Sequence, residues 1–102
     1  MPAAHRLGDT GTGHGCWPSR ANSQASTNVF IESKKADRGW HRVGDSWESH
    51  CCTKKPYPCH ASTMERGSTT VFVNKKPAAR IGDDVACGSR AATGSGTVFA
   101  GG

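Results

Sequence analysis

Apolar residues in this chain occur in short groups separated by long polar stretches. The clearest groups are Thr27–Ile31 and Thr69–Val73, in which β-branched and aromatic residues with polar ends are typical of short strands. No window carries apolar residues at the i, i+3, i+4 and i+7 positions of a helix, so little or no helix is expected. The pattern predicts an all-β domain of short strands and hairpins.

Two short signatures alternate along the chain, and each is present three times. The first is Arg-aliphatic-Gly-Asp, at residues 6–9, 42–45 and 80–83, and the second is Ser-x-x-Val-Phe, at residues 26–30, 68–72 and 95–99. Each repeat unit opens with the first and closes with the second, which gives units 6–30, 42–72 and 80–99. The Gly-Asp pairs lie 36 and then 38 residues apart, so the sequence indicates one fold built of three copies. The units differ in length, which places variable loops between the two signatures.

The signatures also predict local structure. In the first signature an aliphatic residue between polar neighbours is followed by Gly, which indicates a brief extended segment running into a tight turn. Two of the Val-Phe segments are followed by a pair of lysines, Lys34-Lys35 and Lys75-Lys76, before the next signature begins. We therefore expect a recurring hairpin of strand, turn and strand.

Composition shows that such a domain needs more than an apolar core. The chain has 102 residues, enough for one small domain over 1–102 with no appended effector module expected. Leu, Ile, Val and Phe together number 12 and the formal net charge is +5, a balance that leans toward disorder unless another element holds the fold. A metal, a disulfide framework or burial against a partner would supply that element.

Cysteine usage favours the metal over the disulfides. The five cysteines are an odd number, and the N-terminal residues have no apolar run that could serve as a signal peptide, so a secreted disulfide scaffold is the weaker choice. We expect Cys16, Cys51 and Cys52 to be buried thiols, and a pairing of Cys51 or Cys52 with Cys59 stays open. No stretch approaches the length of a membrane span.

The basic charge does not point to one kind of partner. Lys and Arg number 13 against 8 Asp and Glu, but they are scattered, and no groove-reading motif accompanies them. A solvated or partner-facing surface is the expected explanation. A zinc-stabilised nucleic-acid-binding module is an alternative function, and it would require a continuous basic face.

Candidate metal ligands occupy equivalent loop positions of the three units. His14 and His50 each follow their signature Asp by five residues, and Cys87 follows Asp83 by four. If the units surround a common pseudo-threefold axis, these three side chains converge near it. A tetrahedral zinc site needs a fourth ligand, and the adjacent pair Cys59-His60 can supply either a thiolate or an imidazole.

Other histidines and the signature aspartates have different expected roles. His5 and His41 directly precede the signature Arg and are expected to lie within a strand, with His41 as the substitute ligand. The signature Asp follows Gly in every unit, where an Asp side chain commonly caps a turn. No hydrolase elbow, HExxH pair or phosphate-binding loop is present, so we expect no enzyme. A small zinc-dependent hydrolase, which would need an open metal position, is the second alternative.

The ordered set of motifs resembles the PAAR-repeat proteins. Pro77-Ala78-Ala79-Arg80 is the motif that names this family, and Pro2-Ala3-Ala4-His5-Arg6 repeats it imperfectly. The further matching motifs are Gly8-Asp9 leading to His14-Gly15-Cys16, Ser26 to Phe30, His41 to Asp45, His50-Cys51-Cys52, Cys59-His60, Ser68 to Val73, and Ala86-Cys87-Gly88. The resemblance implies a small cone of short strands with pseudo-threefold symmetry, a flat base, and one structural zinc ion held by three His and one Cys. That pattern favours His60 over Cys59 as the fourth ligand, which gives the set His14, His50, His60 and Cys87.

The resemblance also implies a function. Proteins of this family cap the trimeric β-helix of the VgrG spike in type VI secretion systems, or the central spike of contractile phage tails, with one monomeric tip per trimer. The implied location is the cytoplasm before firing, followed by secretion or delivery into the target cell with the spike, or else the tip of a phage virion tail. The implied contacts are a transient one with a membrane and noncovalently bound effectors, with no nucleic acid. Unit-equivalent apolar residues are the candidates for the core and for its continuation onto the partner-binding base: Val29, Phe30, Val71, Phe72, Val98 and Phe99.

Overall fold

The computed structural model describes residues 1–31 and 38–101, and within them the chain is built of short strands and turns. The strands are β1 (Phe30–Ile31), β2 (Arg38–Gly39), β3 (Ser46–Cys51), β4 (Cys59–Thr63), β5 (Phe72–Val73) and β6 (Lys76–Pro77). They pair as antiparallel hairpins, β1 with β2, β3 with β4, and β5 with β6. The described residues form no helix, and hence none long and apolar enough to cross a membrane. The all-β prediction is confirmed.

Two predicted hairpins surround the lysine pairs. Strands β5 and β6 are joined through Asn74 and Lys75, both with left-handed backbone at φ 52° and 66°. The second hairpin therefore forms as expected but turns one residue before the Lys75-Lys76 pair, because Lys76 already lies in β6. Strands β1 and β2 pair through Phe30 with Gly39 and Ile31 with Arg38. The turn expected at Lys34-Lys35 lies outside the described residues.

Each first signature folds into the same turn. The Asp N–H donates to the carbonyl of the Arg three residues earlier, at 2.9, 3.0 and 3.1 Å in the three units. The Asp carboxylate in return accepts from the N–H and the Nε of that Arg at 2.8 to 3.0 Å. The Gly between them is left-handed, with φ of 80°, 89° and 88°, a conformation that favours glycine. The predicted capping role of Asp9, Asp45 and Asp83 is confirmed.

The three units meet in a closed ring of backbone hydrogen bonds. His5 N donates to Ala79 O at 3.0 Å, Ala79 N donates to His41 O at 2.9 Å, and His41 N donates to His5 O at 3.1 Å. These three residues precede the signature Arg of their units, and all are fully buried. Because equivalent residues use equivalent groups, the ring relates the units by a pseudo-threefold axis.

Each second signature ends in an exposed phenylalanine. The hydroxyl of Ser26, Ser68 or Ser95 accepts from the N–H three residues later, at 2.9 Å in every unit. The Phe that follows this turn is about half exposed in all three units: Phe30 54%, Phe72 57% and Phe99 48%. The next residue is buried instead: Ile31, Val73 and Ala100.

The prediction that these apolar residues belong to the core is therefore wrong for the three phenylalanines, and their continuation onto the partner-binding base stays a prediction. Successive side chains of an extended segment point to opposite faces, so only one of two neighbouring apolar residues can point inward. Val29, Val71 and Val98 are half-buried. The core is built instead around Trp47 with Met64, Ala79, Val85 and Ala91.

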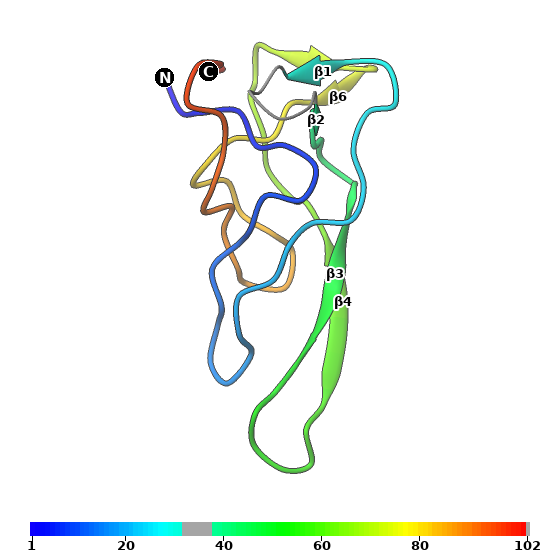
Figure 1. Cartoon of the computed structure of the whole chain (residues 1–102), viewed down its shortest axis with the longest axis vertical. Helices are drawn as coiled ribbons and strands as arrows, with labels where there is room; N and C mark the ends of the chain where they lie inside the picture. Colours follow the sequence, from blue (N-terminus) through cyan, green and yellow to red (C-terminus); the bar gives the residue numbers. More distant parts are fainter. Residues whose placement is uncertain (32–37, 102) are drawn as a thin grey trace.

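The hairpin of β3 and β4 gives the molecule its length. The principal extents are 40 × 29 × 22 Å. Figure 1 shows β3 and β4 running along the long axis, with their connecting loop forming the narrow end. Both chain termini, β1 and β6 lie at the broad opposite end. We call this opposite end the base. It includes Phe30 of β1, Phe72 of β5, which pairs with Pro77 of β6, and Phe99, which pairs with Ala3 near the N-terminus.

Candidate metal centre

The structure brings together one side chain from each of four segments. His14 comes from a loop of the first unit, His50 and His60 come from β3 and β4, and Cys87 comes from a loop of the third unit. One ligand atom from each of these residues lies within 4.8 Å of the others. These are the same four residues that the family resemblance implies, and we call them the metal group.

Local structure explains how each side chain reaches the group. His50 and His60 are paired directly across the β3–β4 hairpin, so their rings share one face of the ribbon. His14 sits in a tight turn in which His14 and Trp17 exchange backbone hydrogen bonds of 2.9 and 2.8 Å. Cys87 precedes the left-handed Gly88, whose N–H closes a turn onto Val85 O at 3.0 Å.

The spacing of the imidazole nitrogens fits a metal ion. The Nε2 atoms of His14, His50 and His60 are separated by 3.2, 3.1 and 2.6 Å. Ligands at about 2.0 Å from a tetrahedral zinc ion lie about 3.3 Å from one another. His50 Nδ1 donates to the carbonyl of Pro18 at 2.7 Å, so its Nε2 carries a lone pair that faces the other two nitrogens. A metal ion between the three nitrogens would accept this lone pair.

The protonation of the histidines suits the same role. Burial lowers the pKa of His14, and the charges of His50, His60 and Arg20 lower it further. Burial also lowers the pKa of His50, an effect that the bond to Pro18 opposes and that Arg20 and His60 reinforce. Both rings are therefore neutral at pH 7, the form in which imidazole binds a metal.

The neighbours of Cys87 favour its thiolate form. Burial raises the pKa of the thiol, but hydrogen bonds from Ser89 and Arg20 and the Arg20 charge outweigh burial and lower it. The Arg20 guanidinium lies 3.1 Å from the sulfur, donates to the Ser89 hydroxyl at 3.0 Å, and is itself buried. No sequence pattern predicts this role of Arg20, because Arg20 lies outside both signatures and no motif marks it.

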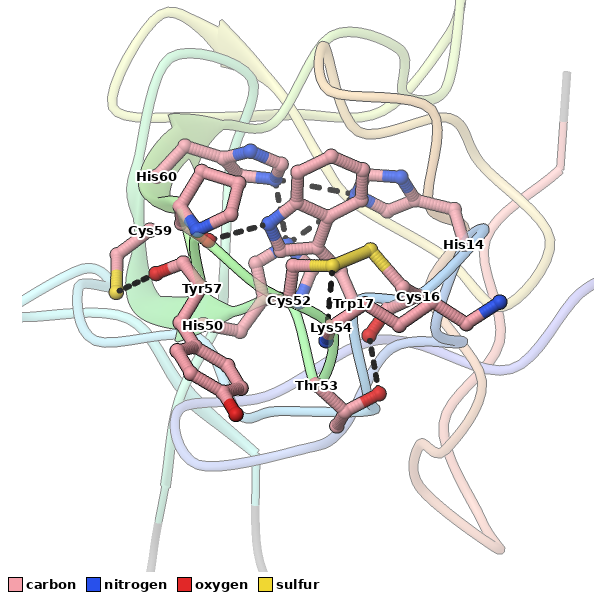
Figure 2. The surroundings of a disulfide bond; sticks show 11 residues. His14, Cys16, Trp17, His50, Cys52, Thr53, Lys54, Tyr57, Cys59 and His60 are labelled. Atoms are coloured by element: carbon pink, nitrogen blue, oxygen red, sulfur yellow. Dashed lines mark hydrogen bonds between the residues drawn. A yellow bond between two sulfur atoms is a disulfide. The ribbon is translucent and has the colours of Figure 1, made fainter.

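The two substitute ligands are not part of the group. His41 is fully buried, and its Nδ1 donates to the carbonyl of Gln24 at 2.6 Å. Cys59 is bonded to Cys51, and it points away from its neighbour His60 because successive strand side chains alternate (Figure 2).

Two disulfides surround the group, and the expectation of buried free thiols is wrong. Cys16 is bonded to Cys52, and Cys51 is bonded to Cys59, the open alternative for these residues. The adjacent Cys51 and Cys52 point to opposite sides, so one reaches β4 and the other reaches the loop of the first unit. Cys87 keeps a free thiol. The odd cysteine count therefore reflects one thiol in the metal group beside two disulfides.

A protein-family model described as the PAAR motif matches residues 7–93. The chain belongs to this family. The family resemblance stated from the motifs is thereby confirmed, and membership implies a role at the tip of a type VI secretion spike. The PAAR motif is a structural unit, and a metal ion is consistent with the His and Cys group found here.

Two curated relatives are much longer proteins. The chain is 34% identical over 85 residues to the NAD(P)(+) glycohydrolase toxin Tse6 of Pseudomonas aeruginosa PAO1. It is 34% identical over 85 residues to the (p)ppApp synthetase toxin Tas1 of Pseudomonas aeruginosa UCBPP-PA14. Each match covers 78% of this chain and 18% of the relative, so the chain spans about a fifth of the length of either toxin.

Proposed function

We propose that this PAAR protein caps a trimeric VgrG-type spike, with one chain on each trimer. The observation that carries the proposal is the trio Phe30, Phe72 and Phe99, which occupy equivalent positions of the three units and are all about half exposed. A single chain with three similar sides can match a threefold partner, whereas an asymmetric monomer would present different contacts to each subunit.

The exposed phenylalanines are suited to a buried interface. Large apolar side chains that are exposed as a set, rather than singly, mark interaction sites. Because each ring is already about half buried, covering its exposed half contributes about 1 kcal/mol. The base is also far from the β3–β4 loop along the long axis (Figure 1), so docking there leaves the narrow end free to lead.

A zinc ion at the four-residue group would hold the narrow end together. His14, His50, His60 and Cys87 would be the ligands, and imidazole nitrogen and thiolate sulfur are both ordinary ligands of zinc. Four protein ligands fill a tetrahedral site, which favours a structural ion over the open position that hydrolysis needs. The metal would supply the folding free energy that a core with few large apolar side chains lacks.

The proposed role is mechanical rather than enzymatic. The activities in the names of the two related toxins are proposed to reside in the parts of those proteins that this chain does not match. The chain would wait in the cytoplasm with the spike and leave the cell when the system fires.

Binding to a recombinant trimeric VgrG-type β-helix tests the proposal by co-elution on a sizing column. Phe72→Asp should abolish co-elution, because it places a charge in the interface. Tyr57→Asp is the matched control: Tyr57 is 52% exposed, similar to Phe72, but lies in the loop between β3 and β4. Co-elution that survives Phe72→Asp, or that is lost equally with Tyr57→Asp, would contradict docking through the base.

A further inference from the structure

Every disulfide cysteine lies within two residues of a candidate metal ligand. Cys16 follows His14 by two residues, and Cys52 follows His50 by two. Cys51 and Cys59 are direct neighbours of His50 and His60. The covalent bonds and the metal group therefore hold the same segments of chain.

The two disulfides constrain the metal group to different degrees. Cys51 and Cys59 are cross-strand partners, as are His50 and His60, so the Cys51–Cys59 bond joins strands that their backbone ladder already pairs. Cys52 N also donates to Pro58 O at 2.8 Å across the same hairpin. Opening the Cys51–Cys59 bond would leave His50 opposite His60.

The Cys16–Cys52 bond instead joins separate units. It ties the loop that carries His14 to the end of β3, 36 residues away along the chain (Figure 2). Hydrogen bonds also connect this loop to β3 and to the β3–β4 connection. Thr53 N and Oγ1 donate to Cys16 O at 3.1 and 3.4 Å, Trp17 Nε1 donates to Pro58 O at 3.1 Å, and His50 Nδ1 donates to Pro18 O at 2.7 Å. His14 itself lies in a turn outside the named strands, so the disulfide and these hydrogen bonds together hold its loop against β3 and β4.

We propose that the Cys16–Cys52 pair is a redox switch that sets the affinity of the metal group. The inference rests on the metal site of the proposed function. When the bond forms, His14 is held against His50 and His60 and the group is preorganised. When the bond opens, the loop gains conformational freedom that metal binding must then remove, so affinity falls.

The redox step needs a disulfide oxidant such as oxidised glutathione. The two thiols lose two electrons and two protons, one S–S bond forms, and one oxidised glutathione becomes two reduced glutathione molecules. Disulfides persist in oxidising compartments and are rare in the cytosol. A chain moved from the cytosol to an oxidising space would thus bind its metal more tightly on arrival.

The coupling must act in both directions. If the disulfide raises metal affinity by a given factor, then bound metal makes the disulfide harder to reduce by the same factor. The effect of the disulfide on metal affinity and the effect of metal on disulfide reduction can be measured separately. The measurement of disulfide reduction needs only the wild-type protein.

Zinc affinity of the full chain, measured by competition with a chromogenic chelator, tests the proposal. The variant Cys16→Ser with Cys52→Ser mimics the open state without adding thiols, and Cys51→Ser with Cys59→Ser is the matched control. We expect the first variant to bind zinc about tenfold more weakly than the oxidised wild type, a coupling of ordinary size. The control should change by less than about threefold, since the hairpin ladder remains.

The outcomes separate this inference from the metal site itself. Equal zinc affinity in the wild type and the first variant, or equal losses in both variants, would refute the switch while leaving the metal site intact. No zinc binding by the oxidised wild type would overturn both.

If the first variant fails to fold, wild-type protein in glutathione buffers decides the question. Mass spectrometry after thiol labelling reports the fraction of the Cys16–Cys52 bond at each ratio of reduced to oxidised glutathione. With buffered zinc present, half-reduction of the Cys16–Cys52 bond should require a glutathione buffer that is about tenfold more reducing. An unchanged midpoint would refute the proposal.

Discussion

The ring of His5 stacks on the indole of Trp47, with centroids 5.1 Å apart and ring planes within 20°. His41 meets the same indole edge-on at 5.4 Å, so two histidines and one tryptophan pack together beside the backbone ring that joins the units. Imidazoles take the place of the aliphatic side chains that this composition lacks. Such packing requires the rings to stay neutral.

Acid should therefore destabilise the fold through His41. Burial lowers its pKa to about 4 and outweighs the bond to Gln24 that raises it. The unfolded chain binds the proton with a pKa near 6.5, so the stabilisation is fully present above about pH 6.5 and is lost as the pH falls toward 4. The free energy of unfolding from urea titrations should fall by about 3 kcal/mol across this window.

The variant His41→Leu provides the comparison for this pH dependence. It removes the titrating ring while keeping an apolar side chain in the core. Its free energy of unfolding should therefore fall less steeply between pH 6.5 and 4 than that of the wild type. Identical slopes would show that His41 does not carry the acid sensitivity.

Removal of one partner from the buried ion pair of the second unit should cost several kcal/mol. Asp45 is fully buried and accepts from Arg42 N, Nε and Nη2 at 3.0, 2.8 and 2.9 Å. Asp45→Asn leaves the guanidinium without its charged partner and should lower the free energy of unfolding by about 3 kcal/mol. Thermal or urea unfolding measures this loss.

A surface carboxylate serves as the control for Asp45. Asp84 contacts Arg66 and Arg90, whose side chains are 73% and 69% exposed, at 3.3 and 3.2 Å. Asp84→Asn should cost less than about 1 kcal/mol, because solvent screens exposed pairs. Similar losses in the two variants would mean that burial of the pair does not determine its contribution.

Metal removal should destabilise the wild type and leave a ligand variant unaffected. Chelation of zinc is expected to lower the thermal midpoint of the wild type by about 10 °C or more. Cys87→Ala should already melt at the lower temperature, and the chelator should not lower it further. A variant that melts like the zinc-loaded wild type would remove Cys87 from the ligand set.

Repetition made most of this structure predictable. The turns at Asp9, Asp45 and Asp83 recur because one local motif satisfies the same backbone groups in each unit. Three members of the metal group could be predicted from the sequence for a related reason. Equivalent loop positions converge when the units surround an axis, so counting from the signature Asp points to His14, His50 and Cys87. His60 required the family resemblance, since it lies in an insertion that only the second unit contains.

The remaining features depend on side-chain direction, which spacing does not report. In Val71-Phe72-Val73 all residues are apolar, and only the strand shows that Phe72 points outward and Val73 inward. Alternation on β3 likewise decides that Cys51 and Cys52 take different partners. Arg20 contacts Cys87 across 67 residues of sequence, a relation that no local pattern encodes.

Native mass spectrometry of the chain mixed with a trimeric VgrG-type spike tests the central claim most directly, because one mass reports both the metal and the stoichiometry. The account predicts a complex of one chain, one zinc ion and three spike subunits. A complex with three chains per trimer, a complex without zinc, or no complex at all would contradict it.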